Sequence, residues 1–177
     1  MIEAQIERYL RDAEIPFRWL PHPRVRTSLE ASEVEHVSGW QVAKSVAVEL
    51  GSGEEILCVV PAPVLVDLDA VCDATGSRDA RLVDEDRLLE LFPGCEPGTA
   101  PPFGKLWDLP VLLERAFCAL DRILVQSGTH DALLEIPTRD FVTLEQPQLV
   151  SISALPGEPW RHAMRAQGAE PHAWHQR

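Results

Sequence analysis

The segment from Gln41 to Leu50 has the pattern of a β-strand that is buried on both sides. Valine recurs along it, its residues alternate, and apart from Lys44 it carries no charge before Glu49. A strand with two mainly apolar faces is typical of the interior of a sheet that has a covering layer on each side. We therefore expect a central sheet that contains this segment.

Shorter strands and helices surround this segment without a regular βαβ order. Alternation or apolar runs predict further strands at 15–19, 55–60, 81–83, 110–113, 122–126, 132–136 and 149–152. Helical spacing and capping residues predict helices at 2–12, 27–34, 67–75, 84–92 and 138–144. Thr27 and Thr138 are the predicted N-caps, Gly39 is expected to end the second helix, and Gly76 is the predicted C-cap of the third. This mixture predicts an α/β fold of the α+β type, with about seven strands in a central mixed or antiparallel sheet, in preference to a doubly wound fold.

The chain is expected to form one domain followed by a tail. Its 177 residues suffice for one well-buried core. The domain is expected to span residues 1–155, and residues 156–177 show no clear period. Trp160 and Trp174 in this tail suggest docking on a synthetase or a second copy of the chain, against plain disorder, which we favour.

Charge and targeting signals restrict the partners. Sixteen Lys and Arg residues against 28 Asp and Glu residues give a net charge of −12, which disfavours a large non-specific nucleic-acid footprint. The start of the chain resembles no signal peptide and no apolar run is long enough to cross a membrane, so we expect a cytoplasmic protein without membrane contact.

Cysteines and histidines predict neither a metal site nor a cofactor. Cys58, Cys72, Cys95 and Cys118 are widely spaced and are expected to be buried free thiols. His172 and His175 have no third ligand near them in the sequence. The chain also lacks a GxSxG elbow, a P-loop, a GxGxxG turn after a strand and an HExxH helix.

Lys44 is the most informative single residue. It shares one side of the predicted strand with Val42 and Val46, and that side is otherwise apolar. Its ammonium either extends to the edge of the sheet or points into a pocket, where it would meet an anion or a polarised carbonyl. The pattern leaves both alternatives open.

Two glycine-containing loops are candidate binding segments. Residues 93–104 form a Gly/Pro-rich loop in which 98–102 could present backbone N–H groups to a carbonyl oxygen or a phosphate. Gly128, Thr129 and His130 follow a predicted strand, at a place where ligands often bind. The alternative for them is an ordinary glycine turn with a surface histidine, and from these residues alone it is favoured.

Several segments, taken in order, resemble the YbaK/ProX family, which includes the editing domain of bacterial prolyl-tRNA synthetases. They are His22-Pro23 with Thr27 and Ala31, 42–46, 98–104, 127–130, and Asp140-Phe141 with Leu144 and Pro147. The resemblance covers about residues 1–153. It implies a single domain with a mixed, partly barrel-like sheet, and hydrolysis of the ester that joins a wrong amino acid to tRNA.

The resemblance also implies roles for individual residues. Lys44 matches the family's motif lysine and would position the phosphate or ester of the acceptor end of a mischarged tRNA, while bound water attacks. Gly98, Thr99, Pro102 and Gly104 of the first loop, and Gly128, Thr129 and His130 of the second, would bind substrate, with His130 lining the amino-acid pocket. Arg24, Arg26, Lys44 and Lys105 are candidate contacts of a small acceptor-end footprint. No cofactor is implied.

Two other functions compete with editing of mischarged tRNA. A catalytically silent module could bind an aminoacyl-like or nucleotide-like ligand, because a fold alone does not guarantee activity. A hydrolase could act instead on another small ester or amide. The presence of Lys44 favours the deacylase.

Overall fold

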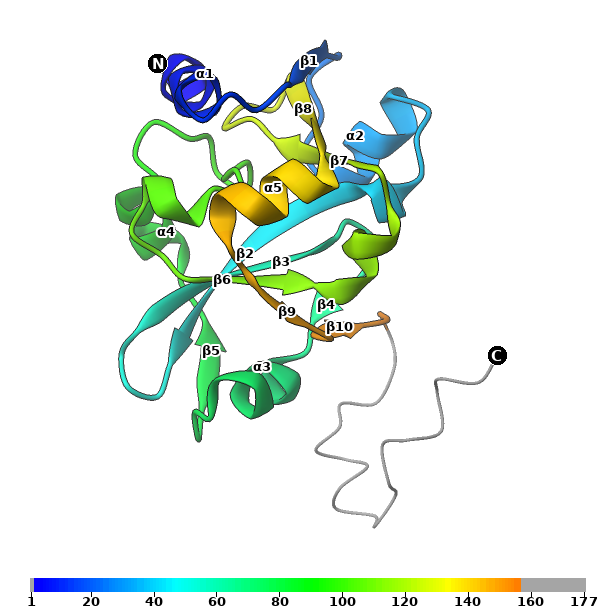
Figure 1. Ribbon diagram of the computed structural model, residues 1–177. Helices are drawn as coiled ribbons and strands as arrows, with labels where there is room; N and C mark the ends of the chain where they lie inside the picture. The colour runs from blue at the N-terminus through cyan, green and yellow to red at the C-terminus, as the bar shows by residue number, and fades with distance from the viewer. Residues whose placement is uncertain (1, 157–177) are drawn as a thin grey trace.

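The computed structural model describes residues 2–156, which fold into a strongly twisted mixed sheet with helices on both faces (Figure 1). The helices are α1 (Ile2–Asp12), α2 (Ser28–Val34), α3 (Leu68–Thr75), α4 (Glu85–Leu91) and α5 (Thr138–Glu145), with short 3₁₀ turns η1 (Gly39–Gln41), η2 (Gly104–Leu106) and η3 (Arg115–Ala119). The strands are β1 (Arg18–Pro21), β2 (Val42–Leu50), β3 (Glu55–Pro61), β4 (Leu65–Val66), β5 (Ala80–Leu82), β6 (Val111–Glu114), β7 (Arg122–Gln126), β8 (Ala132–Pro137), β9 (Gln148–Val150) and β10 (Ser153–Ala154). The expected α/β domain with a central mixed sheet is confirmed.

β2 is the central strand, as its sequence predicts. The strand order is β1-β8-β7-β2-β3-β6-β9, β5 also pairs with β2, and β4 and β10 form a separate two-stranded ribbon. One edge of β2 pairs with β3 from Ala43 to Glu49. The other edge is divided, because β7 pairs with Val42 and Ala43 while β5 pairs with 48–50. Lys44 lies between these two partners, where the neighbouring strands diverge.

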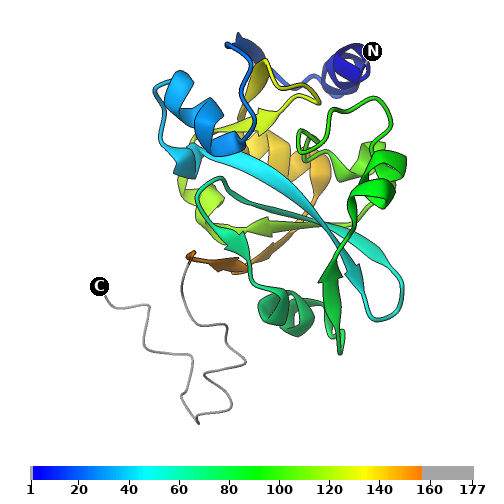
Figure 2. The same ribbon diagram turned by 180° about the vertical axis from the view of Figure 1, so that it is seen from behind.

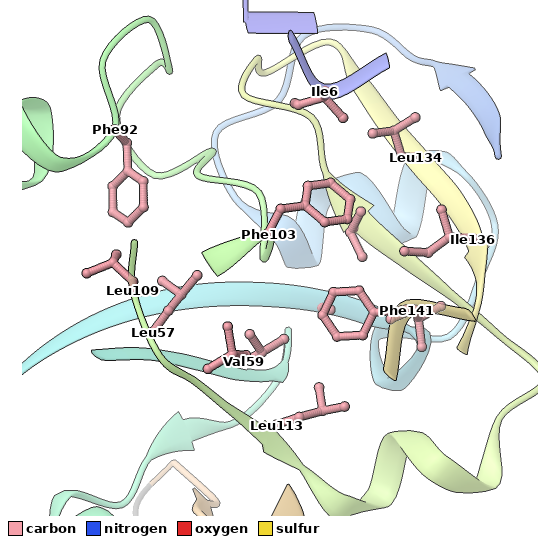
Figure 3. Packing of buried hydrophobic residues seen from close by; sticks show 14 of the residues in the cluster. Ile6, Leu57, Val59, Phe92, Phe103, Leu109, Leu113, Leu134, Ile136 and Phe141 are labelled. Carbon is pink, nitrogen blue, oxygen red and sulfur yellow. The ribbon is translucent and has the colours of Figure 1, made fainter. Parts of the chain in front are cut away.

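Two layers of helices cover the sheet (Figures 1 and 2). α1, α4 and α5 cover one face over the largest apolar cluster, in which Phe103 lies between Ile6 of α1 and Phe141 of α5 (Figure 3). On the other face, a second cluster joins α3 to β2, β3 and β6, and a third joins Ala31 of α2 to Val42, Leu124 and Leu133. The loop 93–104 is anchored to the core by its residue Phe103, which is fully buried.

Local capping residues explain several helix starts. Thr27 accepts from the Glu30 N–H, Asp67 from the Ala70 N–H and Asp84 from the Arg87 N–H, as expected for N-caps. Gly76 ends α3 in the left-handed conformation. Residue types alone were therefore sufficient to place these ends.

Other predicted ends are wrong because tertiary contacts set them. Thr138 is the first residue of α5 and Pro137 precedes it without a side-chain cap, because the Thr138 N–H donates to Asp121 O. α2 ends at Val34, and Gly39 begins η1 instead of ending the helix. The strand predicted at 149–152 already ends at Val150 in β9, and the Ile152 N–H donates to the Glu114 carboxylate instead of to a strand. β1 begins only at Arg18, where its pairing with Glu135 begins.

The four cysteines are free, but only Cys58 is fully buried. Cys72 and Cys95 are partly exposed and Cys118 is exposed, so the expectation of buried thiols is wrong for these three.

Between residues 2 and 156, no helix combines the length and apolar character that a bilayer crossing requires. The predictions for the tail, including docking on a synthetase or a second copy, concern residues beyond Pro156 and lie outside the described residues. The division at residue 155 remains a prediction.

Candidate functional site

Lys44 lies beside the point at which β7 leaves the sheet. Ala43 pairs with Val125, so the next position along β2 lies next to Gln126, the last residue of β7. Directly afterwards the chain enters the turn 127–131 that leads into β8. The lysine and the second glycine loop, which are more than 80 residues apart in the sequence, are thus neighbours in the sheet.

The Lys44 ammonium is half-buried and has a carbonyl as its partner. Its Nζ donates to Ala62 O at 3.2 Å. Desolvation lowers the pKa of the lysine, because burial disfavours the charged form. Among the ion pairs of the described residues, none involves Lys44. The site therefore has a cation without a carboxylate to neutralise it.

Main-chain hydrogen bonds join the two glycine loops. The Glu96 N–H donates to Gly128 O and the Gly128 N–H donates to Thr99 O, each at 2.9 Å. The Thr99 hydroxyl donates to Glu96 O at 2.7 Å, which closes the bend around Gly98. The two loops that the sequence offered as separate candidates are thus joined to each other, and the second of them follows the end of β7 beside Lys44.

Gly98 and Gly128 both need the conformational freedom of glycine. Their φ angles are +80° and +90°, where residues with a Cβ are strained. A Cβ at Gly98 would meet no atom within 4 Å, whereas one at Gly128 would lie 2.8 Å from the Ile2 side chain. Gly98 is exposed, so of the two it is the one with open space in front of its backbone.

Thr99, Pro102 and Gly104 are all buried and hold the loop in place. Thr99 is 1% exposed. A Cβ at Gly104 would overlap the carbonyl oxygen of Leu109, so glycine permits a close approach of two backbone segments there. Contact of these three residues with substrate remains a prediction.

Glu96 is a site residue that the sequence reasoning missed. One of its carboxylate oxygens accepts from the His130 N–H at 2.7 Å, and the other accepts from the Arg24 guanidinium at 2.5 Å. The hydrogen bond from Arg24 is the main reason why the pKa of Glu96 is lowered. Glu96 is the single charged residue between 93 and 104, and this isolation was the available signal.

The segment that follows β1 forms another border of the site. The His22 N–H donates to Asp131 O and the Val25 N–H donates to His130 O, so this segment lies along the turn 127–131. Beneath it, the buried Gln126 amide donates to Ser28 Oγ at 2.8 Å and connects β7 to the first turn of α2. His130 and Thr129 are partly buried within this arrangement.

The basic residues predicted as acceptor-end contacts have different surroundings. Arg24 reaches the site through Glu96. Arg26 is exposed next to α2, and its backbone N–H donates to Glu30. Lys105 is held at the C-terminal end of α5, where its Nζ donates to Leu144 O and its backbone N–H donates to Glu145.

A possible metal centre and one groove can be compared with the position of this site. No group of three or more His, Cys, Asp or Glu residues in the described part of the chain is arranged to hold a metal ion. A groove of about 660 Å³ between α1 and β1 is lined by Glu7, Arg11, Glu14, Ile15, Pro16, Phe17 and Trp19. It includes none of the predicted site residues.

Comparison with known sequences gives a family match across this site. The sequence pattern of the family described as the aminoacyl-tRNA editing domain matches residues 22–144, from His22 to the last turn of α5. The multifunctional Ser/Thr-tRNA deacylase ProXp-y of Escherichia coli K12 is 29% identical over 143 residues, which are 76% of this chain and 83% of the relative.

Solved structures share the fold. The hypothetical protein APE2540 superposes with a TM-score of 0.78 at 21% identity, over 85% of this chain and 99% of that protein. A protein proposed as a trans-editing enzyme for prolyl tRNA synthetase superposes with a TM-score of 0.77 at 21% identity, over 86% of this chain and 97% of the other.

Proposed function

The chain belongs to the aminoacyl-tRNA editing domain family and is an aminoacyl-tRNA deacylase, and we propose that Lys44 and the joined glycine loops hold the acceptor end of its mischarged tRNA substrate during ester hydrolysis. The single observation that carries this assignment is the environment of Lys44. A half-buried ammonium that has one carbonyl partner and no ion pair among the described residues retains two N–H donors for a substrate.

The proposed roles follow from what hydrolysis of an ester requires. A phosphate or carbonyl oxygen of the acceptor end would accept from Lys44 Nζ, which compensates the desolvation of the ammonium. Backbone at Gly98 and Gly128 would contact the aminoacyl group, and His130 would line its side-chain pocket. An activated ester needs chiefly orientation and stabilisation of the developing oxyanion, which such an arrangement supplies while water attacks.

Two side chains near the glycine loops, Ser127 and Cys95, could in principle act as covalent nucleophiles, but neither is activated, which supports attack by water. Ser127 Oγ lies 2.7 Å from Ala132 O, to which it donates. Cys95 lies next to Gly128, but burial raises the pKa of its thiol to about 11, so it is a neutral thiol near pH 7. Neither side chain has the activated form that covalent catalysis needs.

We further propose Ser-tRNA and Thr-tRNA species as the first substrates to examine. The relative named a Ser/Thr-tRNA deacylase aligns with 76% of this chain and supports that choice. A pocket that separates small amino acids by size alone gains only about 1–3 kcal/mol per methylene, so small side chains are the usual reason for an editing step.

The test is hydrolysis of a panel of correctly and wrongly charged tRNAs, which includes Ser-, Thr-, Ala- and Cys-tRNA species. We expect selective release of one amino acid or a small group of amino acids, and a fall in kcat/KM of about 100-fold or more in Lys44→Ala. Arg122→Ala is the control, because it removes one positive charge at the opposite end of β7 and is expected to leave the rate unchanged.

Two outcomes would contradict different parts of the proposal. A folded Lys44→Ala variant that retains the wild-type rate would remove Lys44 from the site. A wild-type chain that releases no amino acid from any member of the panel would instead favour a silent binding module.

A further inference from the structure

We propose that His22 is a substrate-binding residue of this site, whose Nε2 accepts a hydrogen bond from a hydroxyl group at the aminoacylated end of the tRNA. This inference rests on the proposed function and adds the kind of group that the site recognises.

The hydrogen bond at Nδ1 determines what Nε2 can do. His22 is 9% exposed, and its Nδ1 lies 2.9 Å from Pro23 O. A carbonyl oxygen only accepts, so Nδ1 carries the proton of this bond. In the imidazole tautomer with its proton on Nδ1, Nε2 is the acceptor of the ring.

Nε2 is buried and has no hydrogen-bond partner within the described part of the chain. Buried polar atoms in native proteins are nearly always paired, because an unpaired one loses its hydration without compensation. An acceptor of this kind selects a donor, so carbonyl and phosphate oxygens are excluded as partners. An O–H group of a bound molecule fits.

The sheet places His22 on the same face as Lys44. Its N–H donates to Asp131 O, which continues the pairing of Pro21 with Ala132 at the end of β1. His22 is two positions beyond Leu20 and Lys44 is two positions beyond Val42, and Leu20 and Val42 belong to the apolar cluster under α2. His22 and Lys44 therefore lie on the same face of the sheet, each directly beyond this apolar cluster along its strand.

The turn 127–131 lies along this rim. In Figure 1, β1 lies directly against β8, and the chain between β1 and α2 passes the turn that precedes β8. The Val25 N–H donates to His130 O, so the His22 segment and the predicted amino-acid pocket are fixed to each other by main-chain bonds. A ligand held by Lys44 and this turn would come within the neighbourhood of His22.

The end of a charged tRNA supplies hydroxyl donors from two sources. The ribose of the terminal adenosine keeps one hydroxyl next to the ester, and a seryl or threonyl group carries another on its side chain. Both are O–H donors of the same chemistry. The ring acceptor fits either hydroxyl, and the experiment distinguishes the two sources.

The experiment compares His22→Asn with His22→Gln. Asn retains a polar group near the position of Nδ1 but has none at Nε2, whereas Gln extends an amide toward that position. We expect Asn to lower kcat/KM for Ser-tRNA about tenfold, as for the loss of one neutral hydrogen bond, and Gln to restore part of it. The melting temperature of each variant is measured alongside, so that a loss of folded protein is not counted as a loss of binding.

Changes in the substrate then identify the hydroxyl without altering the fold. Each variant is compared with the wild type on Ser-tRNA and Ala-tRNA with the same tRNA body, and on tRNA ending in 2′-deoxyadenosine, by kcat/KM and by Kd. A tenfold penalty that disappears with Ala-tRNA identifies the side-chain hydroxyl. A penalty that disappears with the deoxy end identifies the ribose.

Three results would overturn the inference. The first is a folded His22→Asn variant with wild-type kcat/KM and Kd on every substrate. The second is an equal penalty on all substrates, with or without either hydroxyl, which would show that Nε2 only stabilises the fold. The third is a wild-type chain without activity on the panel, which would end the proposed function and this inference together, whereas the first two leave Lys44 and the deacylase unaffected.

Discussion

At the scale of single residues, one carboxylate connects three segments of the site. Glu96 accepts from Arg24, which precedes α2, and from the His130 N–H in the turn 127–131, while Glu96 itself belongs to the loop 93–104. Exposed ion pairs usually contribute about 0–1 kcal/mol to stability. We therefore expect Glu96 to contribute mainly by fixing the relative positions of these three segments, and little to overall stability.

We expect Glu96→Gln to affect activity more than stability. An amide keeps one acceptor but weakens the pairing with Arg24 or the bond to His130, so kcat/KM for the released amino acid should fall about tenfold. The melting temperature should change little. Glu55→Gln is the matched control, because Glu55 pairs with Arg87 at 2.7 Å in an Arg–Glu contact that the proposed site does not include. Equal losses of activity in both variants would contradict the positioning role.

Gly53 is a control for Gly98, because it distinguishes the effect of backbone strain from the loss of a substrate contact. Gly53 has a φ of +86° and, as at Gly98, a Cβ there would meet no atom within 4 Å. Both Gly→Ala variants should cost about 1–2 kcal/mol of unfolding free energy, because alanine resists a positive φ. Only Gly98→Ala should also lower kcat/KM.

Urea unfolding and the deacylation assay together check this pair. An activity loss of the same size in Gly53→Ala would mean that strain alone explains the effect. Full activity in Gly98→Ala would remove the backbone of Gly98 from the binding surface.

At the scale of elements, Glu145 joins α1, η2 and α5. Its buried carboxylate accepts from the Tyr9 hydroxyl at 2.7 Å and from the Lys105 N–H at 3.1 Å. Burial raises the pKa of Glu145, and the hydrogen bond from Tyr9 opposes that increase. Because Lys105 follows directly on the loop 93–104, this contact fixes one end of the loop to two helices.

Tyr9→Phe should destabilise the domain in a pH-dependent way. Without the hydroxyl, the folded-state pKa of Glu145 rises further above its unfolded value of about 4.3. A raised folded pKa favours folding at low pH, and this advantage is lost as pH rises through the folded pKa. The cost of the substitution should therefore be about 1–2 kcal/mol near pH 7–8 and smaller near pH 5.

Unfolding in urea at both pH values measures this difference. In a Glu145→Gln background the carboxyl cannot ionise, so the pH dependence of the Tyr9→Phe cost should vanish. A cost that stays constant from pH 5 to 8 in the wild-type background would show that Glu145 does not titrate as its burial implies.

At the scale of the whole molecule, the net charge of −12 opposes binding of a polyanion. A footprint limited to two or three phosphates at the acceptor end reconciles this charge with the family's substrate. The slope of log K against log salt concentration should then be only about −1.4 to −2.1, at about −0.7 for each single-stranded phosphate. Arg24→Ala and Arg26→Ala should each make this slope less steep, whereas Arg122→Ala should leave it unchanged. An unchanged slope in the first two variants would exclude them as contacts.

Much of the fold could be predicted from the sequence because local rules set it. Alternation identified β2 as an interior strand, and the predicted cap at Thr27 placed the start of α2. Asp67 and Asp84, predicted as the first residues of their helices, are the N-caps of α3 and α4. The ends that failed, at Thr138 and near Ile152, depend on acceptors from Asp121 and Glu114 that the local sequence does not reveal.

For the site, the sequence by itself determined that Lys44 shares a face with apolar residues and that two glycine-containing loops are candidate binding segments. Only the tertiary structure decided that Lys44 and the second loop are neighbours. β7 pairs with the first residues of β2, so the turn 127–131 that follows β7 begins beside the divided edge of β2. It also decided what surrounds Glu96 and His22. Their surroundings come from segments 34 and more than 100 residues away, and neither composition nor periodicity encodes which distant backbone groups will be nearby.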